Sequence, residues 1–249
     1  MFPVTYATLS RQGDRDYNED SVGVESADQK WCFVLADGLG GHGKGEVASG
    51  IAVTTSKTCF GAGKENLADW FEEAQKSISE VQVRLHAESQ MKTTMAAAEL
   101  TPEFLSWGHI GDSRIYYFRK NRLVERTLDH SVPQMLVNMG QIKEKDIRFH
   151  EDRNRLLRVM GTEWRGERPY ELDHMAVPKG EQALLLCSDG FWELIDEERM
   201  TECLKQADSP ENWLERMERI VCENGKDVDM DNYSAIAVWF GEKSRFPFF

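Results

Sequence analysis

Four aspartates stand beside glycine or small polar residues at the ends of apolar segments. They are Asp37 in VLADG, Asp112 in HIGDS, Asp189 in LCSDG and Asp231 in DMDNYSAIAV. If adjacent strands of a sheet bring them to one edge of the core, the gathered carboxylates either take up protons or bind cations. Oxygen ligands favour hard ions such as Mg²⁺ or Mn²⁺ over zinc. Because aspartate beside glycine is also ordinary turn chemistry, the spacing alone leaves both interpretations open.

A charged segment near the N-terminus, RDYNEDS, offers further phosphate and metal chemistry. Arg15 is followed by Glu19 and Asp20. An arginine fork suits bidentate binding of phosphate, and the two acids can reach a metal ion or its water shell. The alternative interpretation is a solvated, charged turn.

The glycine-rich stretch LADGLGGHGKGEVAS matches two nucleotide-binding patterns, the P-loop and the dinucleotide loop. A P-loop needs serine or threonine after Lys44, where this chain has Gly45. A dinucleotide fold needs a second parallel strand, whereas the residues after Ser49 have a helical pattern. Both patterns are therefore rejected, and the residue of interest is the aspartate that precedes the glycines.

The elements that must position these residues are strands and helices that occupy separate parts of the chain. Short turns join the segments between residues 93 and 126, which indicates antiparallel sheet. Strands are predicted at 4–11, 20–26, 31–37, 93–100, 103–110, 114–118, 122–126, 182–190 and 233–240, and helices at 46–60, 67–85, 196–206 and 210–223. The order predicts an α+β fold of antiparallel sheets with segregated helices, and an irregular insertion around residues 131–160.

Composition limits the class of protein. The chain has 249 residues, 41% of them hydrophobic, and a formal net charge of −13. We expect one globular domain, a monomer, with no nucleic-acid partner, because a broad basic surface is missing. The five cysteines are scattered singly, and the sequence shows neither a signal peptide nor a membrane helix. These features predict a cytoplasmic protein without a membrane partner.

Eight motifs follow one another in an order that resembles the metal-dependent protein phosphatases of the protein phosphatase 2C type, in particular their compact bacterial serine/threonine members. The motifs are RDYNEDS, ADGLGGHGKGEVAS, TTM, GHIGDSRIYYF, DHSVPQMLVNMGQI, NRLLRVMG, CSDGFWELI and DNYSAIAV, within residues 11–240. The resemblance implies a four-layer α-β-β-α sandwich of two antiparallel sheets flanked by helices. It also implies a single catalytic domain over 1–249, with a flap insertion at about 129–160.

The same resemblance implies roles for individual residues. Asp37 resembles the carboxylate that bridges two metal ions, and Gly38 the residue whose backbone carbonyl binds one of them. Asp189 and Asp231 resemble ligands of the other ion.

Four further roles are implied by the flanking motifs. Glu19 and Asp20 resemble acids that act on the metal ions directly or through water, and Arg15 resembles the arginine that binds the substrate phosphate. Asp112 stands where some members hold a third, weaker metal ion.

The implied reaction is the hydrolysis of phosphoserine and phosphothreonine in proteins, which reverses a serine/threonine kinase. The nucleophile is water activated between two Mn²⁺ or Mg²⁺ ions, and no phosphoenzyme is needed. Some members have histidine directly after the bridging Asp-Gly, as an acid, but this chain has Leu39 there, and His42 is not assigned that role. Two alternatives stay open: a two-metal phosphodiesterase, and a phosphatase-like regulator that binds phosphoprotein without turnover.

Overall fold

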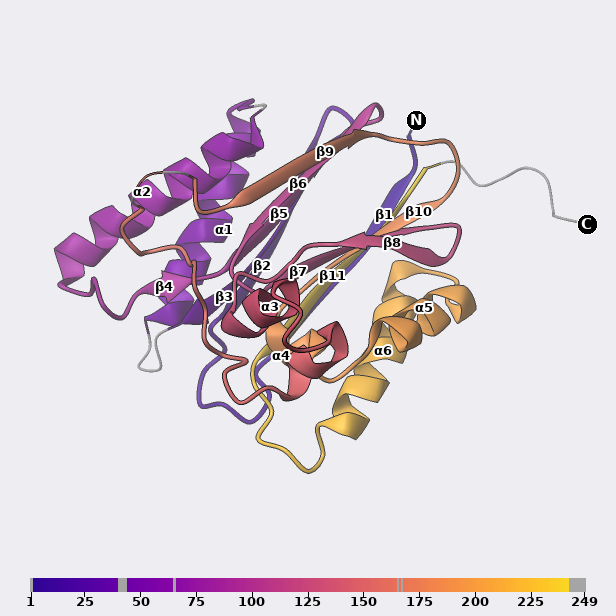
Figure 1. Cartoon of the computed structure of the whole chain (residues 1–249). Helices are drawn as coiled ribbons and strands as arrows, with labels where there is room; N and C mark the ends of the chain where they lie inside the picture. Colours follow the sequence, from indigo (N-terminus) through magenta and orange to yellow (C-terminus); the bar gives the residue numbers. More distant parts are fainter. Residues whose placement is uncertain (1, 40–43, 65, 165, 167, 242–249) are drawn as a thin grey trace, which may run out of the picture.

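Two antiparallel sheets pack face to face, with helices on both outer sides (Figure 1). The structure is a computed structural model that describes residues 2–39, 44–64, 66–164, 166 and 168–241. Its strands are β1 (Val4–Arg11), β2 (Asp20–Ala27), β3 (Lys30–Leu39), β4 (Lys92–Thr93), β5 (Met95–Leu100), β6 (Phe104–Ile110), β7 (Arg114–Arg119), β8 (Arg122–Arg126), β9 (Glu171–Ala176), β10 (Gln182–Cys187) and β11 (Tyr233–Phe240). The β11 sheet has the order β1-β11-β10-β7-β8, and the β3 sheet the order β2-β3-β5-β6-β9, with β4 paired to β3.

Alternate side chains along the central strands build separate cores on the two faces of each sheet. Phe33 and Leu35 of β3 meet Ile236 and Val238 of β11 in the core between the sheets. The intervening residues of each strand, such as Val34, pack against helices instead. This arrangement confirms the predicted α+β sandwich of two antiparallel sheets with flanking helices.

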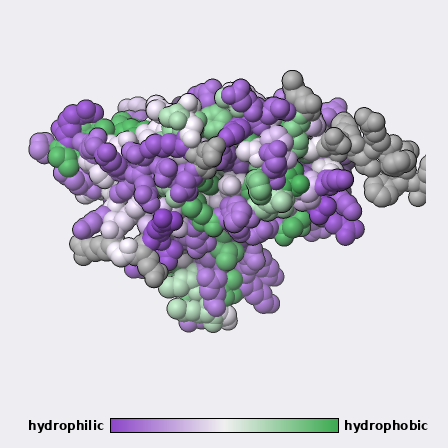
Figure 2. All heavy atoms as spheres, turned by 90° about the horizontal axis from the view of Figure 1, so that it is seen from above, coloured by the Kyte–Doolittle hydropathy of each residue, from purple (hydrophilic) through white to green (hydrophobic). Residues whose placement is uncertain are grey.

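Two helix pairs cover the outer faces of the sandwich. The helices α1 (Gly45–Gly61) and α2 (Leu67–Leu85) pack on the β3 sheet, while α5 (Glu197–Gln206) and α6 (Pro210–Asn224) pack on the β11 sheet. The shorter elements are α3 (Val132–Asn138), the 3-10 helix η1 (Glu144–Phe149) and α4 (Asp189–Trp192). Among the described residues, no helix combines the length and the apolar character needed to cross a membrane. Hydrophilic side chains cover most of the face seen in Figure 2.

The structure differs from the sequence-based expectation at three strands. The strand predicted at 182–190 ends at Cys187, and α4 begins at Asp189. Strand β9 was not predicted, because apolar and polar residues do not alternate along its sequence, ELDHMA, and almost all of them are exposed at the edge of the β3 sheet. The strand predicted at 93–100 is divided into β4 and β5 at Thr94, whose N–H donates to the carbonyl of Asp37 (2.9 Å). Segment 129–160 contains α3 and η1, as the expected irregular insertion, and its Asn154 and Leu156 reach the cavity described below.

Candidate active site

Asp37 lies at the edge of the sandwich because the alternation of β3 carries it there. It continues the row of Phe33 and Leu35, so its side chain faces the β11 sheet, and it stands directly opposite Asp20 of β2. Its backbone is fixed by Thr94: the Asp37 N–H donates to Thr94 Oγ1 (3.0 Å), and the Thr93 hydroxyl donates to the Asp37 carbonyl (2.8 Å). The TTM motif therefore holds the end of β3 in place.

The glycines next to Asp37 allow three backbone segments to meet. A Cβ atom on Gly38 would lie 2.3 Å from the carbonyl carbon of Gly45, and one on Gly45 would lie 2.8 Å from Glu19 Oε1. The Gly45 N–H at the start of α1 donates to that same Glu19 oxygen (3.2 Å). Close packing explains these two glycines without a phosphate-binding role. Residues 40–43, including His42, lie outside the described residues.

Asp189 and Asp231 come from the other sheet. Asp189 follows β10 and begins α4, and its Oδ1 accepts a hydrogen bond from the Gly190 N–H (2.6 Å). A Cβ on Gly190 would lie 2.2 Å from the carbonyl oxygen of Asn232, so the glycine lets α4 approach the start of β11 beside Asp231. The expectation that adjacent strands of one sheet gather the aspartates is therefore wrong, because the β3 and β11 sheets both contribute.

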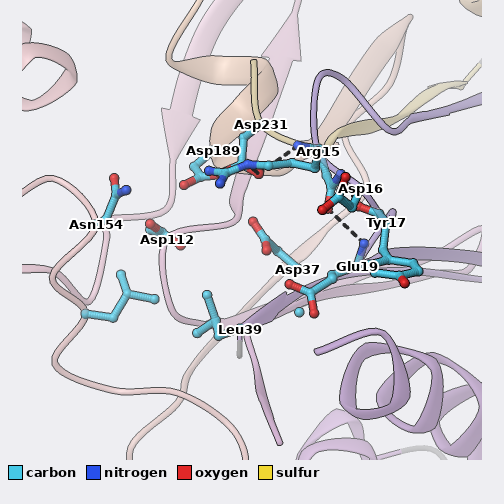
Figure 3. A pocket seen from close by; sticks show the side chains of 13 residues that line it. Arg15, Asp16, Tyr17, Glu19, Asp37, Leu39, Asp112, Asn154, Asp189 and Asp231 are labelled. Atoms are coloured by element: carbon cyan, nitrogen blue, oxygen red, sulfur yellow. Dashed lines mark hydrogen bonds and ion pairs between the residues drawn. The ribbon is translucent and has the colours of Figure 1, made fainter. Parts of the chain in front are cut away.

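These side chains surround one cavity of about 440 Å³ (Figure 3). Seven of the residues proposed from the sequence line it: Arg15, Glu19, Asp37, Gly38, Asp112, Asp189 and Asp231. The eighth, Asp20, does not line the cavity. Its carboxylate is buried behind the site, where Oδ2 accepts a hydrogen bond from the Ser188 hydroxyl (2.8 Å).

Burial and mutual repulsion dominate the electrostatics of the site. Burial, followed by the neighbouring carboxylates, raises the pKa of Asp37 and of Asp112 well above the ordinary value. Burial also raises the pKa of Asp189 and brings the pKa of Asp20 to about 7. Asp20 Oδ1 has no hydrogen-bond partner among the described residues. Apart from Arg15, the described residues that line the cavity supply no positive charge, so this largely buried all-oxygen set fits hard divalent cations.

Arg15 is the cation that the described chain brings to the cavity. Its Nε and Nη2 donate to Asp231 Oδ1 and Oδ2, at 2.9 and 2.8 Å (Figure 3). The structure thus places the arginine expected to bind phosphate on a carboxylate expected to bind metal. The two-pronged geometry shows that Arg15 can hold an oxyanion inside the cavity.

Sequence reasoning missed one residue that organises the site. The Asn232 side chain donates to the carbonyls of Gln12 and Tyr17 (2.7 and 2.8 Å) and accepts from the Glu19 N–H (2.8 Å). It therefore holds the N-terminal loop, with Arg15 and Glu19, against the start of β11. The only signal in the sequence was its place in the DNYSAIAV motif.

Comparisons with known proteins agree with this arrangement. The family profile described as protein phosphatase 2C matches residues 9–225. The serine/threonine phosphatase stp of Listeria welshimeri is 36% identical over 205 residues, which cover 77% of this chain and 79% of that protein. The crystal structure of the serine/threonine phosphatase Stp1 from Staphylococcus aureus has a TM-score of 0.83 at 26% identity and covers 98% of this chain and 96% of that one. The catalytic domain of PstP in complex with two manganese ions has a TM-score of 0.78 at 26% identity and covers 97% of this chain and 100% of that one.

Proposed function

Because the chain belongs to the protein phosphatase 2C family and is a metal-dependent protein-serine/threonine phosphatase, we propose that Asp37, Asp189 and Asp231 are its catalytic metal ligands. They would hold two Mn²⁺ or Mg²⁺ ions. The observation that supports this most is the meeting of buried carboxylates from both sheets in one cavity. When bound, the cations lower the pKa of coordinated water and offset charge on the phosphoryl oxygens.

The remaining carboxylates complete the metal site in this proposal. Asp37 would be a ligand shared by the two ions, and Gly38 would offer its carbonyl to one of them. Glu19 and Asp20 would act directly or through water, with Asp20 fixed by Ser188. Asp112 would be the ligand of a third, weaker ion.

Arg15 binds the phosphate of the substrate. Its Nε and Nη2 donate hydrogen bonds to the two carboxylate oxygens of Asp231, and a phosphoryl group offers a similar pair of acceptor oxygens. Among the described residues no histidine lines the cavity, and Leu39 occupies the position after Gly38. We therefore propose that the leaving serine or threonine oxygen takes its proton from water in the cavity. Segment 129–160, which supplies Asn154, forms the flap beside the substrate.

The substrates are phosphorylated proteins, and we propose that a cognate serine/threonine kinase opposes the enzyme. We further propose that it acts as a monomer, which is supported by the cavity that the described residues of one chain already form. A cytoplasmic location is consistent with the five cysteines, all of which are free thiols.

The proposal is tested by hydrolysis of a phosphothreonine peptide with Mn²⁺, with a chelator, and with Asp37→Asn and Asp189→Asn. We expect a chelator and either substitution to lower kcat at least about 100-fold, as for loss of a principal electrostatic contribution. Asp208→Asn, which removes an exposed aspartate beside α6, is the matched control and should keep full activity. Activity that survives chelation, or that persists in both variants, contradicts the metal mechanism.

The same experiment separates the two alternatives. Cleavage of a bis-aryl phosphodiester without action on the peptide would support the phosphodiesterase. Binding of two metal ions and phosphopeptide without turnover of either ester would support the regulator. The net charge of −13 and the acidic cavity disfavour a nucleic-acid substrate.

A further inference from the structure

The turn that carries Asp112 crosses from one sheet to the other. It joins β6 of the β3 sheet to β7 of the β11 sheet and contains Gly111, which has φ +101°. A Cβ on Gly111 would lie 2.6 Å from Thr94 Cγ2, so the turn is pressed against the residue that fixes Asp37. The place of Asp112 therefore depends on contacts made by its own backbone.

One such contact comes from the helix turn that begins at Asp189. Trp192 is the last residue of α4, and its indole Nε1–H donates to the backbone carbonyl of Asp112 at 3.0 Å. The Trp192 side chain thus links the turn bearing Asp112 to the turn bearing Asp189. Both carboxylates point into the cavity (Figure 3).

The indole is itself held by buried charges. The guanidinium carbon of Arg114 lies 3.4 Å from the centroid of the Trp192 ring, and Arg114 donates to both oxygens of Asp129 at 2.7 Å. The side chains of this ion pair are each 1% exposed. On the other side, Arg148 Nε donates to the Trp192 carbonyl (3.0 Å). Trp192 is therefore held at two places: Arg114 packs on the face of its ring, and Arg148 binds its backbone carbonyl.

A histidine pair supports the same turn from another direction. The Gly111 N–H donates to His130 Nδ1 (3.2 Å), and the His130 N–H donates to the Gly111 carbonyl (2.9 Å). Because Nδ1 accepts, a neutral His130 carries its proton on Nε2, which faces Glu171 Oε1 at 3.4 Å. His109 stacks on His130 with ring centroids 4.6 Å apart. An imidazole binds a cation in the plane of its own ring, and the planes of two stacked rings are parallel and do not meet at one point. His109, His130 and Glu171 are therefore poorly arranged to bind one cation, and they support the turn instead.

We infer that Trp192 is a positioning residue that sets the Asp112 carboxylate beside Asp189 and so tunes the affinity of the third, weaker cation site, whose proposed ligand is Asp112. The inference rests on the proposed function, in which both aspartates are metal ligands. Partners that orient metal ligands change metal affinity by roughly 10–100-fold when they are removed. Loss of the indole N–H should therefore weaken one cation site while leaving Arg15 and the phosphate site unchanged.

Core packing alone is the competing explanation, and the chain offers a matched control for it. Trp213 of α6 is fully buried, and its Nε1–H donates to the Met200 carbonyl at 3.1 Å, between α5 and α6. Trp192→Phe and Trp213→Phe each remove one buried indole hydrogen bond to a backbone carbonyl. They differ in whether that carbonyl belongs to a proposed metal ligand.

The test measures Mn²⁺ binding to the chelator-stripped full chain by calorimetry, alongside the Mn²⁺ dependence of phosphopeptide hydrolysis. We expect Trp192→Phe to weaken the weakest Mn²⁺ site roughly 10-fold, with an unchanged KM for peptide at saturating Mn²⁺. Trp213→Phe should lower the melting temperature and leave Mn²⁺ binding as in the wild type. Equal weakening in both variants, or wild-type binding by Trp192→Phe, overturns the inference.

Two further variants keep the outcome decisive. Benzothienylalanine at position 192 retains the two-ring shape and lacks the N–H, so it replaces Trp192→Phe if that variant fails to fold. Asp112→Asn distinguishes the metal role proposed for Asp112 from the positioning role inferred for Trp192. If it binds Mn²⁺ normally, the metal role proposed for Asp112 fails and the inference fails with it. If it weakens binding and the change at Trp192 does not, only the positioning role is refuted.

Discussion

Replacing Asp20 by asparagine should stabilise the metal-free protein at alkaline pH. Asp20 is 7% exposed, one of its oxygens has no partner among the described residues, and it stands opposite Asp37 in the sheet register. The variant keeps the shape of the side chain and removes one of the mutually repelling charges. Asp208→Asn, on the exposed surface, is the control.

The size of the effect follows from the pKa of Asp20. Burial raises this pKa from 3.8 to about 7, so between those pH values the folded protein holds a proton that the unfolded chain has released. The free energy of unfolding therefore falls as pH rises through this range and is lowest above about pH 7. At about 1.4 kcal/mol for each tenfold change in proton affinity, the penalty is about 4 kcal/mol. Burying an amide with an unpaired group costs about 1–3 kcal/mol, which leaves a gain of about 1–3 kcal/mol at pH 8.

Urea unfolding in EDTA at pH 8 and at pH 4 measures this gain. The stabilisation by Asp20→Asn should be present at pH 8 and absent at pH 4, where the wild-type carboxyl is neutral in the folded state. With Mn²⁺ added at pH 8, the wild type should gain more stability than the variant. An equal gain at both pH values, or no gain at pH 8, would refute the reasoning.

Three other changes should have measurable effects. In steady-state kinetics at saturating Mn²⁺, Arg15→Lys should raise the KM for a phosphothreonine peptide about 10-fold, because lysine lacks the bidentate fork; an unchanged KM counts against phosphate binding by Arg15. In urea unfolding, Asp129→Asn should cost about 3–5 kcal/mol by leaving the Arg114 guanidinium buried without its partner, and Arg114→Met combined with Asp129→Leu should recover most of that loss. Burial lowers the pKa of His130 from 6.5 to about 4, so the unfolded chain binds this proton first and stability falls as pH drops through that range. His130→Gln should remove up to about 3 kcal/mol of that acid-induced loss, as monitored by thermal unfolding in EDTA, and an unaltered pH slope would contradict this assignment.

The regular parts of the fold were predictable from the sequence because their patterns are long and local. The ranges predicted at 4–11, 67–85 and 233–240 have the bounds of β1, α2 and β11. In α2 the spacing of apolar residues indicates which face is buried, whereas β11 is a continuous apolar segment that is buried on both faces. β9 was not predicted because its mostly exposed residues, ELDHMA, do not alternate between apolar and polar.

The site was predictable only as a set of candidates. No local pattern states that Asp37 and Asp189, on different sheets, face one cavity, so their meeting was inferred from the ordered motifs. The pairing of Arg15 with Asp231 joins residues 216 positions apart. The hydrogen bond from Trp192 to Asp112 likewise spans 80 positions and involves a backbone carbonyl. Contacts of this kind arise from tertiary packing and leave no trace in spacing.

The origin of the carboxylates on both sheets has a mechanical consequence. In the proposed metal site, a cation shared by Asp37 and Asp189 would link the β3 sheet to the β11 sheet at one end. At the opposite end, apolar side chains such as Phe240 pack between the sheets, and the Phe2 N–H donates to Gln29 Oε1 (3.2 Å). Separation of the sheets at the site would then require the cation to leave first. Ions bound there would therefore hold the two sheets together reversibly, and we expect the rate at which the sheets separate at the site to follow the rate of metal release.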